Sequence, residues 1–120
     1  MSYKVLIVDD APFIREILQS YFESRSDIAE VKEAVDGEEA LSIFESFAPD
    51  IVFMDIVMPK LSGIEATRKI RQTNTKTPIV GLSTLDHGDV INRMLKAGAN
   101  TFVKKPFSLE DLNAAIEECL

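Results

Sequence analysis

Several features that would identify a particular class of protein are scarce or missing in this sequence. It has one cysteine, Cys119, which excludes an internal disulfide and fits a reducing environment. No stretch approaches the ~20 uninterrupted apolar residues that a membrane-spanning helix needs. The first residues run directly into a strand-like segment and lack the apolar region and cleavage site of a signal peptide. We therefore expect a cytoplasmic protein that does not interact with membranes.

An excess of positive charge is also missing. The chain has 13 lysine and arginine residues against 20 aspartate and glutamate residues, which gives a net charge of -7. Such a surface repels nucleic acid, so we expect no direct binding to DNA or RNA. It suits a protein that binds cations or docks on basic partners.

The chain shows no internal repeat, low-complexity tract or linker. Its 120 residues are the usual size of one domain, and 46% of them are hydrophobic, enough for a substantial core. We therefore expect one domain over residues 1–120.

Short apolar runs alternate five times with amphipathic segments. The predicted strands are 4–8, 29–34, 51–54, 79–82 and 101–104. Three of them contain four consecutive apolar residues, as strands buried on both faces of a parallel sheet require. The pattern predicts an α/β fold, a doubly wound (βα)5 sheet with helices on both faces.

The segments between the strands carry helix signals. Pro12 suits a first helical turn, and Asp36, Ser62 and Ser108 each stand three residues before an acidic residue, in the manner of a capping box. Two helices are expected to bury an apolar face, formed by Phe13, Ile14, Ile17, Leu18, Tyr21 and Phe22 in the first and by Leu109, Leu112, Ile116 and Cys119 in the last.

Polar residues follow the predicted strands where each one ends. Asp9 and Asp10 follow the first, Asp55 follows the third, Ser83 and Thr84 follow the fourth, and Lys104 and Lys105, with Pro106 after them, come at the end of the fifth. Ligands of open α/β sheets bind outside the carboxyl ends of the strands. We therefore expect three carboxylates, a hydroxyl and an ammonium group to share one site.

Crowded carboxylates repel one another, and a hard cation would neutralise them. Mg²⁺ prefers oxygen ligands and often bridges to a phosphate. Asp55 could then act as a nucleophile toward phosphorus and form an aspartyl phosphate, while Mg²⁺ and Lys105 offset charge on the transferred group.

The order and spacing of these residues resemble the receiver domains of bacterial two-component response regulators, over the whole chain. The matching motifs are Val8-Asp9-Asp10, Met54 to Pro59 with Gly63, Ser83, Gly98-Ala99 before Phe102, and Lys105-Pro106-Phe107. Each motif is weak alone, but together and in order they are specific. The segment Val8 to Arg15 is similar to single-domain chemotaxis regulators of the CheY type, whose strand order is 2-1-3-4-5.

The resemblance implies roles for individual residues. Asp10 and Asp55 would bind Mg²⁺ directly, Asp9 through water, and Val57 through its carbonyl. Asp55 would be the phosphoacceptor, and the Lys105-Pro106 bond would be cis.

The resemblance also implies a switch. Ser83 would move to donate a hydrogen bond to the phosphoryl group, and Phe102 would turn inward into the vacated space. Thr84 is a rival for the hydroxyl role, but the family spacing favours Ser83. The implied partners are a histidine kinase and a protein target bound by the fourth helix, fifth strand and fifth helix, with the chain a monomer or a phosphorylation-dependent dimer.

Three positions depart from the common family pattern. Thr84 replaces a smaller residue, and apolar Val57 and Leu85 lie two residues beyond Asp55 and Ser83. Side chains there flank the path of the water that hydrolyses an aspartyl phosphate. We therefore expect a comparatively long-lived phosphoryl group.

Several of these residues also fit simpler roles. Asp9 and Asp10 alone could be helix caps, and Phe102 could be an ordinary core residue. The chain could be a receiver from a larger regulator or a phosphorelay intermediate. A phosphohydrolase would space its two aspartates by one residue, and a flavin-binding domain would carry a Ser/Thr/Gly-rich loop after the first strand, so both are disfavoured.

Overall fold

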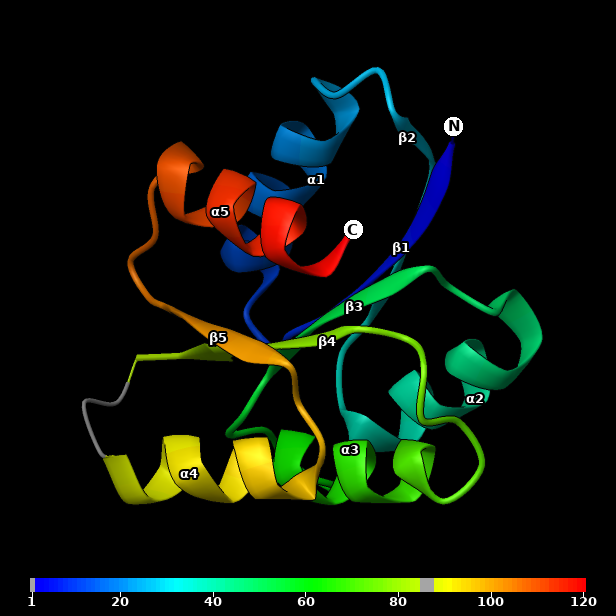
Figure 1. Ribbon diagram of the computed structural model, residues 1–120, viewed down its shortest axis with the longest axis vertical. Coiled ribbons are helices and arrows are strands. Elements are labelled where there is room, and N and C mark those ends of the chain that lie inside the picture. The colour runs from blue at the N-terminus through cyan, green and yellow to red at the C-terminus, as the bar shows by residue number, and fades with distance from the viewer. Residues whose placement is uncertain (1, 85–87) are drawn as a thin grey trace.

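The computed structural model describes residues 2–84 and 88–120. Strands and helices alternate along the described chain (Figure 1). The elements are β1 (Tyr3–Val8), α1 (Pro12–Glu23), β2 (Ile28–Ala34), α2 (Gly37–Phe47), β3 (Ile51–Asp55), α3 (Gly63–Arg71), β4 (Ile79–Ser83), α4 (Gly88–Ala97), β5 (Thr101–Lys104) and α5 (Leu109–Cys119).

The strands form one parallel sheet in the order β2-β1-β3-β4-β5. The predicted fold class is confirmed, and so is the order that the resemblance implies. β3 and β4 each extend one residue beyond the predicted strands, to Asp55 and Ser83. Both residues are therefore held by the sheet itself, at its carboxyl edge.

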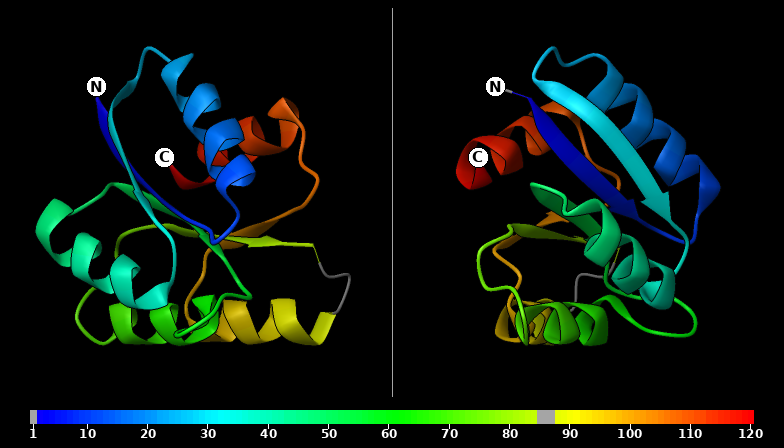
Figure 2. Two further views of the ribbon diagram at one scale, coloured as in Figure 1. Left: turned by 180° about the vertical axis from the view of Figure 1, so that it is seen from behind. Right: turned by 90° about the vertical axis from the view of Figure 1, so that its right-hand side faces the viewer.

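The sheet separates two hydrophobic cores. Alternate residues of β1 face opposite sides, so Val5 and Ile7 pack with α1 and α5, while Leu6 and Val8 pack with α2, α3 and α4. Figures 1 and 2 show α1 and α5 on one side of the sheet and the other helices on the opposite side. Every residue of β3 and β4 is buried, as their continuous apolarity predicts.

Local sequence signals fix where the helices begin. Pro12 occupies the first turn of α1. The side chains of Asp36 and Ser62 each accept a hydrogen bond from a backbone N–H of the following first turn. Ser108 forms a complete capping box with Asp111 at the start of α5. Among the described residues, no helix combines the length and apolarity that crossing a membrane requires.

The predicted apolar faces of α1 and α5 are partly wrong. Phe13 is 63% exposed, Ile17 48% and Leu109 65%. In α1 the buried stripe runs through Ile14 and Leu18. Phe13 and Ile17 each precede a buried residue by one position, which turns them about 100° around the helix axis, away from the sheet.

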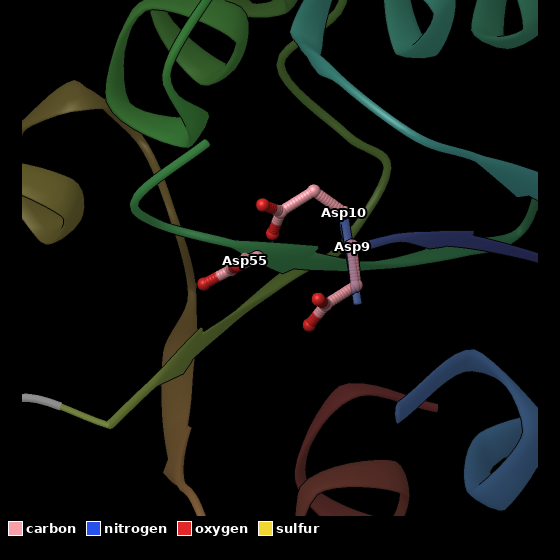
Figure 3. A group of neighbouring side chains, drawn as sticks. All are labelled: Asp9, Asp10 and Asp55. Carbon is pink, nitrogen blue, oxygen red and sulfur yellow. The ribbon is translucent and has the colours of Figure 1, made fainter. Parts of the chain in front are cut away.

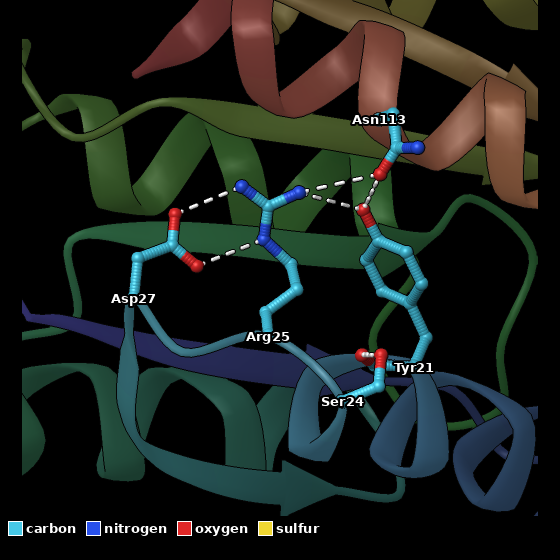
Figure 4. A network of polar contacts seen from close by, with 5 residues as sticks. All are labelled: Tyr21, Ser24, Arg25, Asp27 and Asn113. Carbon is cyan, nitrogen blue, oxygen red and sulfur yellow. Dashed lines mark hydrogen bonds and ion pairs between the residues drawn. The ribbon is translucent and has the colours of Figure 1, made fainter.

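A polar network joins the end of α1 to α5 on this side of the sheet (Figure 4). Arg25 makes a bidentate ion pair with Asp27, with N···O distances of 2.9 and 2.8 Å. The Asn113 side-chain oxygen on α5 accepts hydrogen bonds from the Tyr21 hydroxyl and from Arg25. The Arg25 guanidinium lowers the pKa of the Asp27 carboxyl. This network anchors α5 against α1.

Candidate functional site

The strand register brings four strand ends together at the carboxyl edge of the sheet. Val8 lies opposite Met54, Asp55 opposite Leu82, and Ser83 opposite Lys104. A pocket of about 250 Å³ opens there, lined by Asp9, Asp10, Ala11, Asp55, Val57, Ser83, Thr84 and Lys105. The structure thus brings together every predicted site residue except Phe102 and Pro106.

Three carboxylates form the acidic part of this pocket. One oxygen each from Asp9, Asp10 and Asp55 lies within 4.8 Å of the others, and Figure 3 shows the three side chains gathered beyond the ends of β1 and β3. Asp9 and Asp55 are buried, whereas Asp10 is exposed. This set of hard oxygen donors, open on one side to solvent, fits a divalent cation such as Mg²⁺.

Protein groups already bind both carboxylate oxygens of Asp9. Its Oδ1 accepts a hydrogen bond of 2.9 Å from the Ala11 N–H, and its Oδ2 lies 2.5 Å from the Lys105 ammonium. Its backbone N–H donates to the Ala34 carbonyl on β2, and its carbonyl accepts from Arg15 at 2.6 Å. With its oxygens occupied in this way, Asp9 is better suited to orienting the site than to binding a cation directly.

Asp55 carries the strongest electrostatic perturbation of the site. Burial raises the pKa of its carboxyl to about 7, and the negative charges of Asp9 and Asp10 add to the rise. The Lys105 ammonium, 3.5 Å from Asp55 Oδ1, and the backbone of Val57 oppose it. The site therefore carries more negative charge than the protein alone neutralises, which favours cation binding.

The loop after β3 packs tightly against Asp55. The Gly63 N–H donates to the Ile56 carbonyl at 2.9 Å. A β-carbon at Gly63 would lie 2.1 Å from the Asp55 carbonyl oxygen, so only glycine fits there. Gly63 therefore lets α3 begin directly beneath the strand end that carries Asp55.

The remaining predicted residues surround this centre. Ser83 is 3% exposed, while Thr84 is exposed and Val57 is 58% exposed. Phe102 lies outside the pocket and is 39% exposed on β5, so it is not a core residue in this arrangement. The Lys105-Pro106 bond is cis, the form that the resemblance implies. Leu85 lies outside the described residues.

Sequence reasoning missed two contacts of the site. It did not assign Arg15 a role, although Arg15 binds the Asp9 carbonyl and also Glu33 on β2. It also placed Lys105 near the phosphoacceptor, whereas the shorter contact of Lys105 is with Asp9. Arg15 lies one helical turn after Pro12, so the sequence places it near the β1–α1 loop. Its contacts with Asp9 and Glu33 depend on its side-chain rotamer, which the sequence does not give.

The fold and the site together define a doubly wound α/β domain with a candidate cation site at the carboxyl edge of its sheet. The family model described as "Response regulator receiver domain" matches residues 5–117. The chain therefore belongs to the response regulator receiver domain family.

Curated relatives include proteins of similar length and much longer ones. The chain is 36% identical over 120 residues to the chemotaxis protein CheY of Halobacterium salinarum, covering all of this chain and 98% of that protein. It is 44% identical to a probable transcriptional regulator, ycf27, of Guillardia theta, covering 98% of this chain but 45% of the relative.

A solved structure supports the same assignment. The chain resembles Borrelia burgdorferi CheY, crystallised in a CheX-CheY-BeF3-Mg²⁺ complex, with a TM-score of 0.88 and 31% identity. The similarity covers 95% of this chain and 86% of the other. The chain therefore has the fold of a CheY-like receiver domain.

Proposed function

We propose that this receiver domain is a phosphorylation-activated switch in which Asp55 accepts a phosphoryl group from a histidine kinase. The observation that carries the proposal is the grouping of Asp55 with Asp9, Asp10 and Lys105 in one pocket of a receiver fold. Asp10, Asp55 and the Val57 carbonyl would hold Mg²⁺ there directly, and Asp9 would do so through water. The Borrelia CheY, whose complex contains Mg²⁺ and BeF3, gives this proposal a precedent among similar structures.

In the proposed reaction an Asp55 carboxylate oxygen attacks phosphorus. A P–O bond to Asp55 forms, and the bond from phosphorus to the kinase histidine breaks. Bound Mg²⁺ would lower the cost of bringing the anionic phosphoryl group to an anionic site. Lys105 lies 3.5 Å from Asp55 Oδ1 and is buried among acidic groups, so its ammonium can stabilise charge on the phosphoryl oxygens.

The switch would pass through Ser83 and Phe102. Phe102 pairs with Gly81 in the β4–β5 register, and Ser83 is two residues beyond Gly81. Residues two apart on a strand project from the same face, so the Ser83 and Phe102 side chains belong to the same face of neighbouring strands. A movement of Ser83 toward the phosphoryl group would therefore change the surroundings of the half-exposed Phe102 ring.

The output of this switch would be protein contact. Phe102 borders a groove of about 230 Å³ between β5 and α5, lined also by Lys104, Asp111 and Glu118. We propose that the α4–β5–α5 surface docks a protein target, and that phosphorylation changes its affinity for that target.

The phosphoryl group is expected to be long-lived. Val57 and Thr84 line the pocket beside Asp55, and apolar Val57 offers no group that would orient an attacking water. A substitution of Val57→Asn should shorten the half-life of phosphorylated Asp55 several-fold, measured in Mg²⁺ by intact-protein mass spectrometry. A wild-type half-life of only seconds would contradict the expectation.

The direct test of the switch uses beryllium fluoride, which mimics the phosphoryl group. With Mg²⁺ present, its addition to the wild-type chain should shift NMR resonances at Ser83, Phe102 and along α5. Asp55→Asn should abolish these shifts. Asp50→Asn is the matched control, because Asp50 is an exposed aspartate at the opposite end of β3. Shifts that persist in Asp55→Asn would refute the proposal.

A further inference from the structure

We propose that Arg15 is a positioning residue for cation binding, acting on Asp10 through the backbone of Asp9. This inference rests on the proposed function, because it assumes that the acidic site binds Mg²⁺. It concerns a side chain that does not line the pocket and that, among the described residues, reaches the site through the Asp9 carbonyl oxygen rather than through the site carboxylates.

Arg15 joins two parts of the fold with one guanidinium group. Its Nη1 donates to the Asp9 carbonyl oxygen at 2.6 Å, and its Nε donates to Glu33 Oε1 at 2.9 Å. Glu33 is on β2, directly before Ala34, whose carbonyl accepts from the Asp9 N–H at 3.1 Å. The Arg15 side chain is 16% exposed and Glu33 40%, so the hydrogen bond to the Asp9 carbonyl is the better shielded of the two contacts.

The contact fixes the orientation of a peptide plane. The Asp9 carbonyl and the Asp10 N–H belong to the same rigid peptide unit. Holding the carbonyl oxygen against the guanidinium therefore restricts the rotation of that unit, and with it the direction in which the Asp10 side chain leaves the backbone. The Asp9 side chain has its own anchors in Ala11 and Lys105 and needs this restraint less.

Asp10 has no comparable side-chain anchor. Among residues 2–84 and 88–120, no hydrogen-bond donor or cation contacts its carboxylate, which is exposed. Its place within 4.8 Å of the other carboxylates is therefore set by its backbone. The carboxylate most accessible to a cation thus depends on Arg15 for its position.

A positioning role and simple electrostatics predict opposite changes in Mg²⁺ affinity when Arg15 is replaced. Removing the Arg15 charge near three carboxylates would strengthen Mg²⁺ binding if only Coulomb interactions mattered. Positioning predicts the reverse, because loss of a group that orients a metal ligand commonly weakens metal affinity by about 10- to 100-fold. Arg15→Gln should therefore weaken Mg²⁺ binding by ~10-fold.

The experiment measures the Mg²⁺ dissociation constant of the full chain by NMR titration, with acyl phosphate phosphorylation as a second readout. In Arg15→Gln, phosphorylation should be slow at low Mg²⁺ and recover at saturating Mg²⁺. Glu33→Gln should give a smaller loss, because Arg15 keeps its bond to the carbonyl. Arg15→Lys should recover part of the affinity, because a lysine ammonium can still donate to that carbonyl.

Arg68→Gln is the matched control, because Arg68 pairs with an acidic residue on its own helix and is 52% exposed. It should leave the Mg²⁺ affinity unchanged. Unchanged or tighter binding in Arg15→Gln would overturn the inference while leaving the proposed function intact. Failure of the wild type to bind Mg²⁺ would instead overturn both. If Arg15→Gln does not fold, an affinity of Arg15→Lys equal to the wild type, together with no loss in Glu33→Gln, would overturn the inference.

Discussion

Replacing Asp55 by asparagine should stabilise the metal-free protein at neutral and alkaline pH. Asparagine has the shape of a protonated aspartate and carries no charge. The pKa of the Asp55 carboxyl is near 7 in the folded chain, whereas its ordinary value is 3.8. At a pH between these two values the folded state therefore retains a proton that the unfolded state has lost. Between these values the free energy of unfolding of the wild type falls as the pH rises, since the folded state binds more protons.

The size of the expected stabilisation follows from the pKa shift of Asp55. The pKa rises from 3.8 to about 7, and each pKa unit corresponds to ~1.4 kcal/mol. The wild type therefore loses up to ~4 kcal/mol of stability on ionising Asp55, and relaxation around the coupled carboxylates makes this an upper limit. Asp55→Asn should be about 2–4 kcal/mol more stable than the wild type at pH 8, and similar to it below the unfolded pKa.

The assay is urea unfolding followed by circular dichroism, in EDTA, from pH 4 to pH 8. Asp50→Asn removes one exposed negative charge from the other end of β3 and keeps a side-chain oxygen that can accept the hydrogen bond from the Lys4 N–H, so it controls for net charge and should show little change. The difference in free energy of unfolding between wild type and Asp55→Asn should increase as the pH rises and decrease when Mg²⁺ replaces EDTA. A difference of the same size at all pH values would refute the reasoning, as would a wild type more stable than Asp55→Asn at pH 8.

Four further substitutions test the packing around the site and the helices. Gly63→Ala should destabilise the fold by more than ~2 kcal/mol, because its methyl group would overlap the Asp55 carbonyl, whereas Gly88→Ala should be tolerated because, within the described part of the chain, no atom beyond its neighbours and its own helix backbone lies within 4 Å of a β-carbon there. Asn113→Ala should cost ~1–2 kcal/mol, because it removes the acceptor shared by two donors at the end of α1. Ser108→Ala should cost ~1 kcal/mol through loss of the capping box of α5. Urea unfolding measures all four, and a neutral Gly63→Ala or a costly Gly88→Ala would contradict the packing described.

The fold was predictable because three of its strands contain short runs that are apolar at every position. Such runs occur in this sequence in regular alternation with helix signals, and only a sheet covered on both faces buries them all. The exposure of Phe13, Ile17 and Leu109 was not predictable in the same way. Apolar residues occupy more than one stripe of each helix, and the stripe that packs on the sheet is selected by the tertiary arrangement.

The site was predictable in its membership but not in its contacts. Asp9, Asp10, Asp55, Ser83 and Lys105 each lie at or just after the end of a strand, and the parallel sheet brings these ends together without further information. The pairing of Lys105 with Asp9 and the bridge made by Arg15 depend on side-chain rotamers and on how far each strand end extends past its neighbours. Sequence patterns do not encode these quantities, so Arg15 emerged only from the structure.

The central claim is that Asp55 accepts a phosphoryl group, and intact-mass measurement tests it most directly. The wild-type chain is incubated with Mg²⁺ and a small acyl phosphate, alongside Asp55→Asn and Asp50→Asn. The account predicts that wild type and Asp50→Asn each gain the mass of one phosphoryl group, that Asp55→Asn gains none, and that no gain occurs in EDTA. An unmodified wild-type chain, equal labelling of Asp55→Asn, or rapid continuous release of phosphate without a labelled chain would contradict it.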